Sequence, residues 1–217
     1  MIISTTGLIG SGKDTVADFL TTQYGFKRLS FAASLKDAIA VIFGWDREML
    51  EGRTKAAREM REQVDQWWAD RLDMPLLSPR WVLQNFGTDV CRKYFHDDIW
   101  LAALENKLRK NTDNIVITDA RFPNELKMIK ELDGQCWCVE RGELPAWYEY
   151  AKQYNNSTEE TQMTLRIIAD VQPTPNIFNK RIHQSEWKWI GFHFDNVIDN
   201  DGTIDELYTA IQSIVDR

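Results

Sequence analysis

The sequence has few cysteines and lacks the patterns that usually bind zinc or form disulfides. Three cysteines occur among 217 residues, Cys91, Cys136 and Cys138, and neither a second cysteine pair nor a nearby histidine completes a zinc set. We therefore expect reduced thiols with structural roles. Cys136 and Cys138 lie in an apolar run, and alternate residues of a strand point to the same face.

The sequence also lacks a long apolar run and an excess of basic residues. No segment approaches the about 18 to 20 consecutive apolar residues of a membrane span, and the N-terminal residues lead into a glycine loop instead of a cleavable signal. With 26 basic and 33 acidic residues the formal charge is −7, the wrong sign for holding a nucleic acid polymer electrostatically. We expect a cytoplasmic protein without a membrane or nucleic acid partner, which binds any phosphate locally.

The order of apolar segments predicts strands that alternate with helices, which is typical of a parallel α/β sheet. Strands are expected at residues 1–6, 26–31, 114–120, 135–141 and 196–199. Helices are expected from the glycine loop to Gly25, at 35–43, 80–94 and 99–108, and after Gly202. The chain is long enough to bury one sizeable core, so we predict a single domain over residues 1–217 that carries insertions.

Local signals mark some helix ends. Ser34 is expected to cap the helix 35–43, with Ala38, Ile39 and Ile42 on its buried face. The charge-dense stretch 47–71 has only a thin apolar stripe and is expected to be a surface excursion.

Two further segments lie near the C-terminal end. Residues 142–190 have no clear periodicity and contain Pro145, Pro173 and Pro175, which predicts an irregular, partly helical insertion. Thr203 and Glu206 have the spacing of a capping box at the start of the last helix.

The strongest motif is the segment Gly7 to Thr15, GLIGSGKDT, which matches the pattern G-x-x-x-x-G-K of phosphate-binding loops. In such a loop the backbone N–H groups around Gly10, Ser11 and Gly12 turn toward phosphate oxygens, and Lys13 reaches the β- and γ-phosphates. The segment lies between a predicted strand and a predicted helix, as the motif requires. It predicts a site for ATP or GTP.

The loop departs from the usual motif at Asp14, where a serine or threonine hydroxyl normally ligates Mg²⁺. Either the Asp14 carboxylate approaches the metal, directly or through water, or Thr15 supplies the hydroxyl. The sequence leaves both alternatives open. Mg²⁺ and ATP, as phosphoryl donor, are the expected ligands.

A second signal is the apolar run 115–118, which delivers Asp119 and Arg121 to the carboxyl end of a strand, where α/β sheets place ligands. Asp119 is expected to hold a water of the magnesium ion, and Arg121 to contact a phosphate with two hydrogen bonds. The alternative is that Asp119 caps the following helix, which would begin at Pro123.

The motifs GSGKDT, FGTD, TDAR and NDGTIDEL, in this order and spacing, resemble the deoxynucleoside monophosphate kinases of tailed bacteriophages. The first motif alone is also similar to phosphomevalonate kinases. The resemblance covers essentially the whole chain, and is weak at residues 45–78 and 142–182. It implies a P-loop three-layer α/β fold with a parallel five-stranded sheet, a monophosphate-binding region at 34–96 and a lid region at 142–190.

The resemblance also implies roles for individual residues. Arg141 is expected beside the nucleotide phosphates, and the basic residues Arg166, Lys180 and Arg181 suit a lid that meets phosphate charge. The adenine-contacting loop is implied at Asn200, Asp201 and Gly202. The acceptor nucleotide is expected to be bound by Lys36, Arg80, Gln84, Thr88 and Asp89. For Lys36 the alternative is an exposed lysine on the helix face.

Arg80 and Gln84 are four residues apart on a predicted helix, so both lie on one face, where a guanidinium could meet phosphate and an amide could read a base edge. The alternative is a solvated helix face. The expected reaction transfers the γ-phosphoryl group of ATP to a deoxynucleoside monophosphate, with Lys13, Arg121 and Arg141 in the catalytic set.

Two other functions remain as alternatives at this point, namely another small-molecule kinase of the phosphomevalonate or dephospho-coenzyme A type and an NTP-dependent switch protein. The expected partners are small-molecule nucleotides, with a homodimer as a further option. If a phage encodes the protein, the cytoplasm in question is that of the host.

Overall fold

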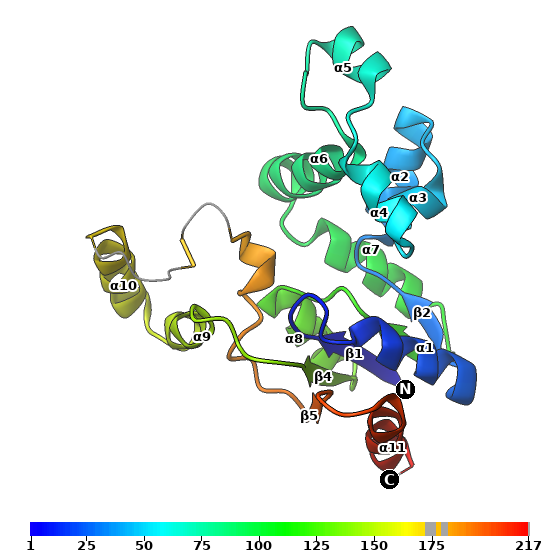
Figure 1. The fold of residues 1–217 in the computed structure, drawn as a ribbon, viewed down its shortest axis with the longest axis vertical. Helices are drawn as coiled ribbons and strands as arrows, with labels where there is room; N and C mark the ends of the chain where they lie inside the picture. Colours follow the sequence, from blue (N-terminus) through cyan, green and yellow to red (C-terminus); the bar gives the residue numbers. More distant parts are fainter. Residues whose placement is uncertain (172–176, 179–181, 217) are drawn as a thin grey trace. The chain divides into compact units, whose positions relative to one another are not determined.

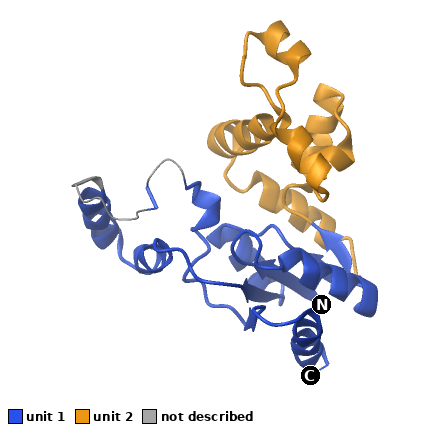
Figure 2. Cartoon of the chain, viewed as in Figure 1, with its two compact units in different colours: residues 1–29, 113–217 blue, residues 30–112 orange. Residues whose placement is uncertain are grey.

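The computed structural model describes residues 1–171, 177, 178 and 182–216. They form two compact units, each with its own core (Figure 2). Unit 1 comprises Met1–Leu29 and Asp113–Arg217, apart from the residues not described, and unit 2 comprises Ser30–Thr112.

Unit 1 is built on a five-stranded sheet in which all described strand pairs are parallel, with the order β2-β3-β1-β4-β5. Figure 1 labels β1, β2, β4 and β5 of this sheet. The strands are β1 (Ile2–Thr6), β2 (Lys27–Leu29), β3 (Ile115–Ile117), β4 (Gln135–Glu140) and β5 (Asn196–Asp199). The predicted parallel α/β class and the five strand positions are confirmed. β1 lies at the centre of this order, so the loop that follows it leaves the sheet between β3 and β4.

Helices cover both faces of this sheet because alternate residues of its strands are buried on opposite sides. Trp137 and Val139 of β4 pack with α1 (Lys13–Tyr24) and α11 (Ile204–Val215). On the other side, α8 (Pro123–Glu131) packs against β4, and Cys136 Sγ lies 3.6 Å from the carbonyl oxygen of Leu126. Cys136 and Cys138 are buried and free, and burial raises the pKa of both thiols to about 12. That all three cysteines are reduced thiols with structural roles stays a prediction.

The helix ends of unit 1 follow the sequence signals closely. Gly25 ends α1 in the left-handed conformation with φ 68°, as predicted. Thr203 caps α11 and accepts a hydrogen bond from the backbone N–H of Glu206, while the Glu206 carboxylate accepts one from the backbone N–H of Thr203. The predicted capping box is therefore confirmed.

The insertion 142–190 is partly helical, as expected. It contains α9 (Tyr148–Asn155), α10 (Glu159–Val171) and the short 3₁₀ helix η2 (Gln184–Glu186). Pro173, Pro175, Lys180 and Arg181, which the sequence analysis placed in this insertion, lie outside the described residues.

Unit 2 is helical throughout its described elements. They are α2 (Ala33–Phe43), α3 (Arg47–Glu51), α4 (Lys55–Glu62), α5 (Gln66–Leu72), α6 (Pro79–Gln84), the π-helical segment η1 (Asn85–Phe95) and α7 (Ile99–Leu108). Its core is made of Leu35, Ile39, Leu50, Ala69, Leu77 and Val82. The charge-dense stretch 47–71 therefore contributes Leu50 and Ala69 to the core of unit 2, although most of the stretch is exposed.

Two predictions about α2 are wrong. The helix begins at Ala33 with Ala32 in the capping position, so Ser34 lies inside the first turn and is not the cap. Ile42 is 52% exposed, whereas Leu35 and Ile39 are buried. The next residue, Phe43, stacks on Trp45, with ring centroids 4.4 Å apart. At the end of α2, Phe43 therefore makes the packing contact that helical periodicity predicts for Ile42.

No helix among the described residues is long and apolar enough to cross a membrane.

Candidate active site

The loop between β1 and α1 is held in a shape that only glycine permits at two positions. Gly12 has φ 102°, and a Cβ atom there would lie 2.3 Å from Asn200 Nδ2. Gly7 is equally confined, because its Cβ would lie 2.3 Å from the carbonyl oxygen of Val139. The Asn200 amide donates a hydrogen bond of 2.8 Å to the carbonyl oxygen of Ser11. The loop is therefore anchored to the ends of β4 and β5 before any ligand binds.

Lys13 is the first residue of α1 and folds back over this loop. Its ammonium donates to the carbonyl oxygens of Gly7 at 2.9 Å and Leu8 at 2.6 Å, and Nζ lies 3.5 Å from Ser11 Oγ. Burial, followed by the positive charge of Arg121, lowers the pKa of Lys13 from 10.5 to about 8. A partly buried ammonium with a lowered pKa, placed at the N-terminus of a helix, is arranged to receive an anion.

Asp14 is paired with a residue that the sequence analysis missed. Its carboxylate accepts a hydrogen bond from Arg28 Nη2, which also donates to Thr118 Oγ1 at 2.8 Å. The side chain of Arg28 is 19% exposed and that of Asp14 75% exposed. Arg28 thus connects the first turn of α1 to the end of β3, across the two elements that carry the expected metal ligands.

Thr15 and Asp119 are both half-buried, and each follows the element that positions it. Thr15 lies in the first turn of α1, and Asp119 comes two residues after β3 ends. The alternative role of Asp119 as a helix cap is wrong, because Phe122 occupies the capping position of α8. Glu125 closes that first turn by accepting hydrogen bonds from the backbone N–H groups of Arg121 and Phe122.

Arg121 forms an ion pair with Glu186, with Nη1 and Oε1 2.8 Å apart. Their side chains are 38% and 25% exposed. Glu186 belongs to η2, at the end of the predicted lid region, and its charge also acts on Lys13. The pairing of Glu186 with Arg121 is a second charged contact of the site that sequence reasoning did not predict.

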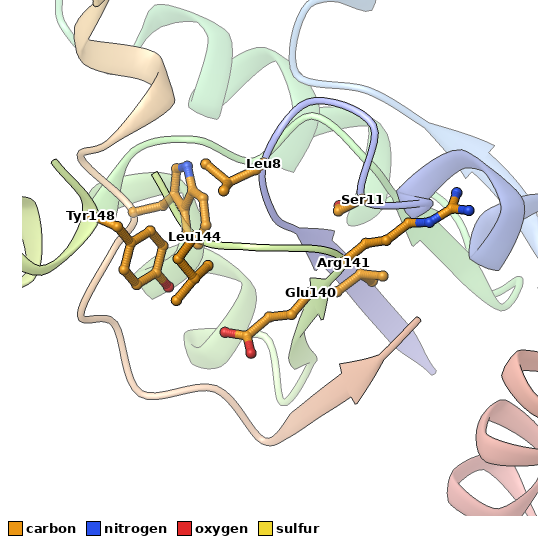
Figure 3. Close-up of a pocket in the computed structure, with 8 residues that line it drawn as sticks. Leu8, Ser11, Glu140, Arg141, Leu144 and Tyr148 are labelled. Carbon is orange, nitrogen blue, oxygen red and sulfur yellow. The ribbon is translucent and has the colours of Figure 1, made fainter. Parts of the chain in front are cut away.

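Arg141 follows β4 and lines a small pocket beside the phosphate loop (Figure 3). The guanidinium extends away from Leu144 and Tyr148, which lie on the opposite side of the pocket (Figure 3). The pocket is lined by Leu8, Ser11, Val139, Glu140, Arg141, Leu144, Tyr148 and Trp189. Arg141 is exposed, so its cationic group is accessible to a ligand at the loop.

The predicted adenine loop is tied to the loop after β4. The Asp201 carboxylate accepts a hydrogen bond of 2.5 Å from the backbone N–H of Gly142, and the backbone N–H of Asp201 donates to Asp199 Oδ1 at 2.9 Å. Gly202 faces the Glu206 carboxylate, which would lie 2.3 Å from an added Cβ. Together with Asn200, these contacts give the 200–202 loop a defined backbone next to the phosphate loop.

The predicted acceptor residues belong to unit 2. Arg80 and Gln84 are exposed on α6, one helical turn apart, and Arg80 Nε lies 3.4 Å from Glu62 Oε1. Lys36 is 12% exposed and donates to Glu51 Oε1 at 2.9 Å, so it is part of an ion-pair network instead of an exposed helix face.

Thr88 and Asp89 lie in η1, next to the buried Gly87. Gly87 allows η1 to approach α2 closely, since a Cβ atom there would lie 2.7 Å from Leu35 Cδ2. The carbonyl oxygen of Gly87 accepts a hydrogen bond from Trp100 Nε1 at 2.9 Å. The segment that carries Thr88 and Asp89 is therefore fixed by packing on two sides.

Of the basic residues predicted for a lid, Arg166 lies among the described residues and has local partners. Arg166 Nε donates to the Tyr154 hydroxyl at 2.8 Å, and its guanidinium lies 5.3 Å from the Phe178 ring centroid. Tyr154 in turn packs edge-on against Trp187, with centroids 5.8 Å apart. Arg166 thus joins α10 to an aromatic cluster within the insertion.

The residues around the loop suit magnesium by their chemistry. Asp14, Thr15 and Asp119 offer only oxygen donors, which Mg²⁺ prefers. No group of three or more metal-binding side chains occurs in the described part of the chain. A few protein oxygens combined with phosphates and water are the usual coordination of Mg²⁺ in nucleotide sites, and the donor set here fits that pattern.

Comparisons with known proteins give the following similarities. No protein-family model matches the chain. Solved structures that align with it include shikimate kinase from Aquifex aeolicus vf5, with a TM-score of 0.44, 14% identity, and coverage of 100% of this chain and 96% of that one. Dephospho-CoA kinase from Campylobacter jejuni aligns with a TM-score of 0.42, 16% identity, and coverage of 99% and 95%.

Two viral proteins are similar in sequence. The chain is 29% identical over 232 residues to an Acanthamoeba polyphaga mimivirus protein named "Putative deoxynucleotide monophosphate kinase", which covers 100% of this chain and 97% of the relative. It is 28% identical over 180 residues to the deoxynucleoside-5'-monophosphate kinase of Escherichia phage T5, covering 60% of this chain and 72% of the relative. The resemblance indicated by the four motifs is thus confirmed, because the chain is similar along its whole length to a viral protein that carries this name.

Proposed function

We propose that this protein transfers the γ-phosphoryl group of ATP to a deoxynucleoside monophosphate, giving ADP and a deoxynucleoside diphosphate for DNA synthesis. The observation that carries the proposal is a preformed phosphate loop, with Lys13 folded over it, in a chain similar from end to end to a viral protein of that name. The same similarity favours this reaction over those of phosphomevalonate kinases, dephospho-coenzyme A kinases or a switch protein.

The loop accounts for donor binding. Backbone N–H groups of residues 10–12 and the N-terminus of α1 attract the phosphates of ATP, and the Lys13 ammonium exchanges its carbonyl partners for phosphate oxygens. The 200–202 loop, held beside the phosphate loop by the Asn200 amide, is the proposed contact for adenine. Only backbone groups are needed for that contact.

The acceptor oxygen belongs to a phosphate group and is already ionised at neutral pH, so no general base is required. Catalysis then consists of positioning and charge stabilisation. Lys13, Arg121 and Arg141 are the proposed groups that stabilise negative charge spread over the transferring phosphoryl group. For Arg121 this requires exchange of its partner Glu186 for phosphate, which the partial exposure of the pair allows.

Asp119 and either Asp14 or Thr15 are the proposed holders of Mg²⁺. When bound, the ion neutralises phosphate charge and fixes the geometry of the phosphate chain. The ion pair with Arg28 favours Thr15 for the direct contact, because the Asp14 carboxylate already has a cationic partner.

Acceptor recognition is proposed for α6 and η1 of unit 2. Arg80 would bind the monophosphate and Gln84 the base edge, and Thr88 and Asp89 would line the acceptor nucleotide. Lys36 is proposed to help bind the acceptor phosphate, and its ion pair with Glu51 holds the ammonium in place. The partners are then small-molecule nucleotides, in the host cytoplasm if a virus encodes the protein, and dimerisation stays a prediction.

The experiment that tests the proposal supplies ATP and Mg²⁺ with each of the four deoxynucleoside and four ribonucleoside monophosphates in turn, and follows both ADP and the diphosphate product. ADP formation should depend on an added deoxynucleoside monophosphate and match the diphosphate in amount. ADP release at the same rate without any acceptor would indicate an NTPase switch instead. A protein that binds ATP but phosphorylates none of the eight would refute the proposed substrate class.

A further inference from the structure

Three arginines come together in unit 2, on two helices that pack against each other. Arg58 and Arg61 lie one turn apart on α4, and Arg80 lies in the first turn of α6. Arg58 Nη1 donates to the carbonyl oxygens of Gly52 at 3.3 Å and Arg53 at 3.0 Å, which leaves it fixed by backbone groups with no carboxylate partner in these contacts.

The guanidinium group of Arg61 lies in a site formed by the backbone of Leu50 and Gly52. Its Nη1 donates to the carbonyl oxygen of Leu50 at 3.2 Å. The planar group lies against Gly52, which has φ 69°, and a Cβ atom at Gly52 would come within 2.3 Å of Arg61 Cζ. Arg61 Nε is buried and has no hydrogen-bond partner within the part of the chain that the structure describes. A buried donor without a partner is costly, so the site requires an explanation.

Neighbouring charges do not balance this cluster. Burial, then the charge of Arg80 and, more weakly, that of Arg58, lowers the pKa of Arg61, while Glu62 and Glu51 oppose the shift. Glu51 is already shared by Lys36, at 2.9 Å, and Arg47, at 2.7 Å. Glu62 is 61% exposed and lies 3.4 Å from Arg80, so it compensates one arginine only weakly.

We infer that Arg61 is a second phosphate-binding residue of the acceptor site, and that the monophosphate group of the acceptor binds between Arg61 on α4 and Arg80 on α6. This rests on the proposed function. A dianionic phosphate supplies the negative charge that the paired arginines lack, and it accepts several hydrogen bonds from planar guanidinium groups at once. Gly52 is required in this arrangement because any side chain there would displace Arg61.

The test compares Arg61→Gln and Arg61→Lys with Arg71→Gln, a matched change at an exposed arginine on α5 of the same unit. Calorimetry gives the Kd of each variant for the deoxynucleoside monophosphate that the wild type binds most tightly, for the corresponding deoxynucleoside without phosphate, and for ATP. Thermal unfolding checks that each variant folds.

Arg61→Gln should raise the Kd for the monophosphate by about 10- to 100-fold, the usual worth of a hydrogen-bonded charge. Arg61→Lys should show a smaller increase, because it keeps the charge without the planar donor. The deoxynucleoside and ATP should bind as in the wild type, and Arg71→Gln should change nothing. If Arg61→Gln does not fold, the result for Arg61→Lys decides.

Two results would overturn the inference. One is a monophosphate Kd within twofold of the wild type in both Arg61 variants. The other is an equal loss for the monophosphate and for the phosphate-free deoxynucleoside, which would mean that Arg61 only supports the fold of α4. In either case wild-type turnover of the monophosphate would leave the proposed function standing, whereas a wild type that neither binds nor phosphorylates any monophosphate would remove both.

Discussion

At the scale of single residues, the site is governed by how each charge is compensated. Lys13 is held by carbonyl dipoles, Asp14 by Arg28, and Arg121 by Glu186. Each partner is either neutral or partly exposed, so a nucleotide with its own charge can replace it at modest cost. Lys13, and the pair of Asp14 with Arg28, each allow a test of this compensation of charge.

The lowered pKa of Lys13 predicts how ATP binding depends on pH. In the free protein the group loses its proton near pH 8, whereas bound phosphate favours the ammonium form and raises this pKa. Binding therefore takes up a proton above pH 8, and the Kd for ATP should rise with pH there by up to about tenfold per unit. Below about pH 7 the contribution of Lys13 should be constant.

The control for this prediction is Lys13→Arg, whose guanidinium stays charged over the whole range. Its Kd for ATP, measured by calorimetry between pH 6.5 and about 9.5, should lack the rise above pH 8, even if binding is weaker overall. Parallel pH profiles for the two proteins would show that Lys13 is not the group that titrates.

The pair Asp14 and Arg28 predicts a rescue by a second mutation. Arg28→Met leaves the Asp14 carboxylate without its cation beside the phosphate loop, where it repels a triphosphate. The Kd for ATP should rise by about 3- to 10-fold, a modest effect because Asp14 is exposed. Adding Asp14→Asn should restore most of the affinity.

A magnesium titration of the same variants separates this role from metal binding. If Asp14 ligates Mg²⁺, Asp14→Asn should raise the magnesium requirement in both the wild-type and the Arg28→Met background. If Thr15 does, the requirement should rise only in Thr15→Val. A double variant that binds ATP no better than Arg28→Met alone would contradict the compensation of charge described here.

At the scale of elements, the sequence predicts what local physics decides. The bounds of α7 and β5, the end of α1 at Gly25 and the capping box of α11 were all predicted, because each depends on residues within a few positions of one another. The hydrogen bond of Arg28 with Thr118 joins residues 90 positions apart, and no local sequence pattern predicts it. Long-range contacts of this kind depend on strand order, which a single sequence does not fix.

The same reasoning explains the errors in unit 2. The burial of Ile42 was predicted from helical period alone, but Phe43 stacks on Trp45 and Ile42 is left exposed. The backbone site of Arg61 was not predicted, because it depends on Leu50 in α3 and on Gly52 at the end of that helix. Of the site, the loop and the acid after β3 could be predicted, whereas the partners that orient them could not.

The capping of α6 predicts a change in acceptor binding at the level of an element. Ser78 Oγ accepts a hydrogen bond from the backbone N–H of Trp81 at 3.2 Å and so holds the start of the short helix that carries Arg80 and Gln84. Ser78→Ala should lower the free energy of unfolding by about 1 kcal/mol. It should also raise the KM for the monophosphate without changing the Kd for ATP.

Thr203→Ala provides the matched control, since Thr203 caps α11 in the same way but in unit 1. It should destabilise by a similar amount and leave the KM for the monophosphate unchanged. Denaturant unfolding and steady-state kinetics measure the two effects. Equal changes in acceptor KM for both variants would mean that general stability, and not the position of α6, determines acceptor binding.

At the scale of the whole molecule, the proposed donor and acceptor groups belong to different compact units. The phosphate loop and the 200–202 loop are part of unit 1, whereas α4 and α6 are part of unit 2. ATP and the acceptor should therefore slow hydrogen exchange in different segments of the chain. Hydrogen exchange resolves them, because it reports how often each backbone amide opens.

ATP alone should slow exchange at residues 7–15 and 200–202, and a deoxynucleoside monophosphate alone should slow it in α4 and α6. A bisubstrate analogue that joins adenosine to a deoxynucleoside through a phosphate chain should protect both sets. If the insertion 142–190 acts as a lid that excludes water from the transferring phosphoryl group, the analogue should also protect α9 and α10 far more than ATP does. Equal protection of α9 and α10 in the free, ATP-bound and analogue-bound protein would show that the insertion is a static part of unit 1, because a cover that closes must lose exchange when it does so.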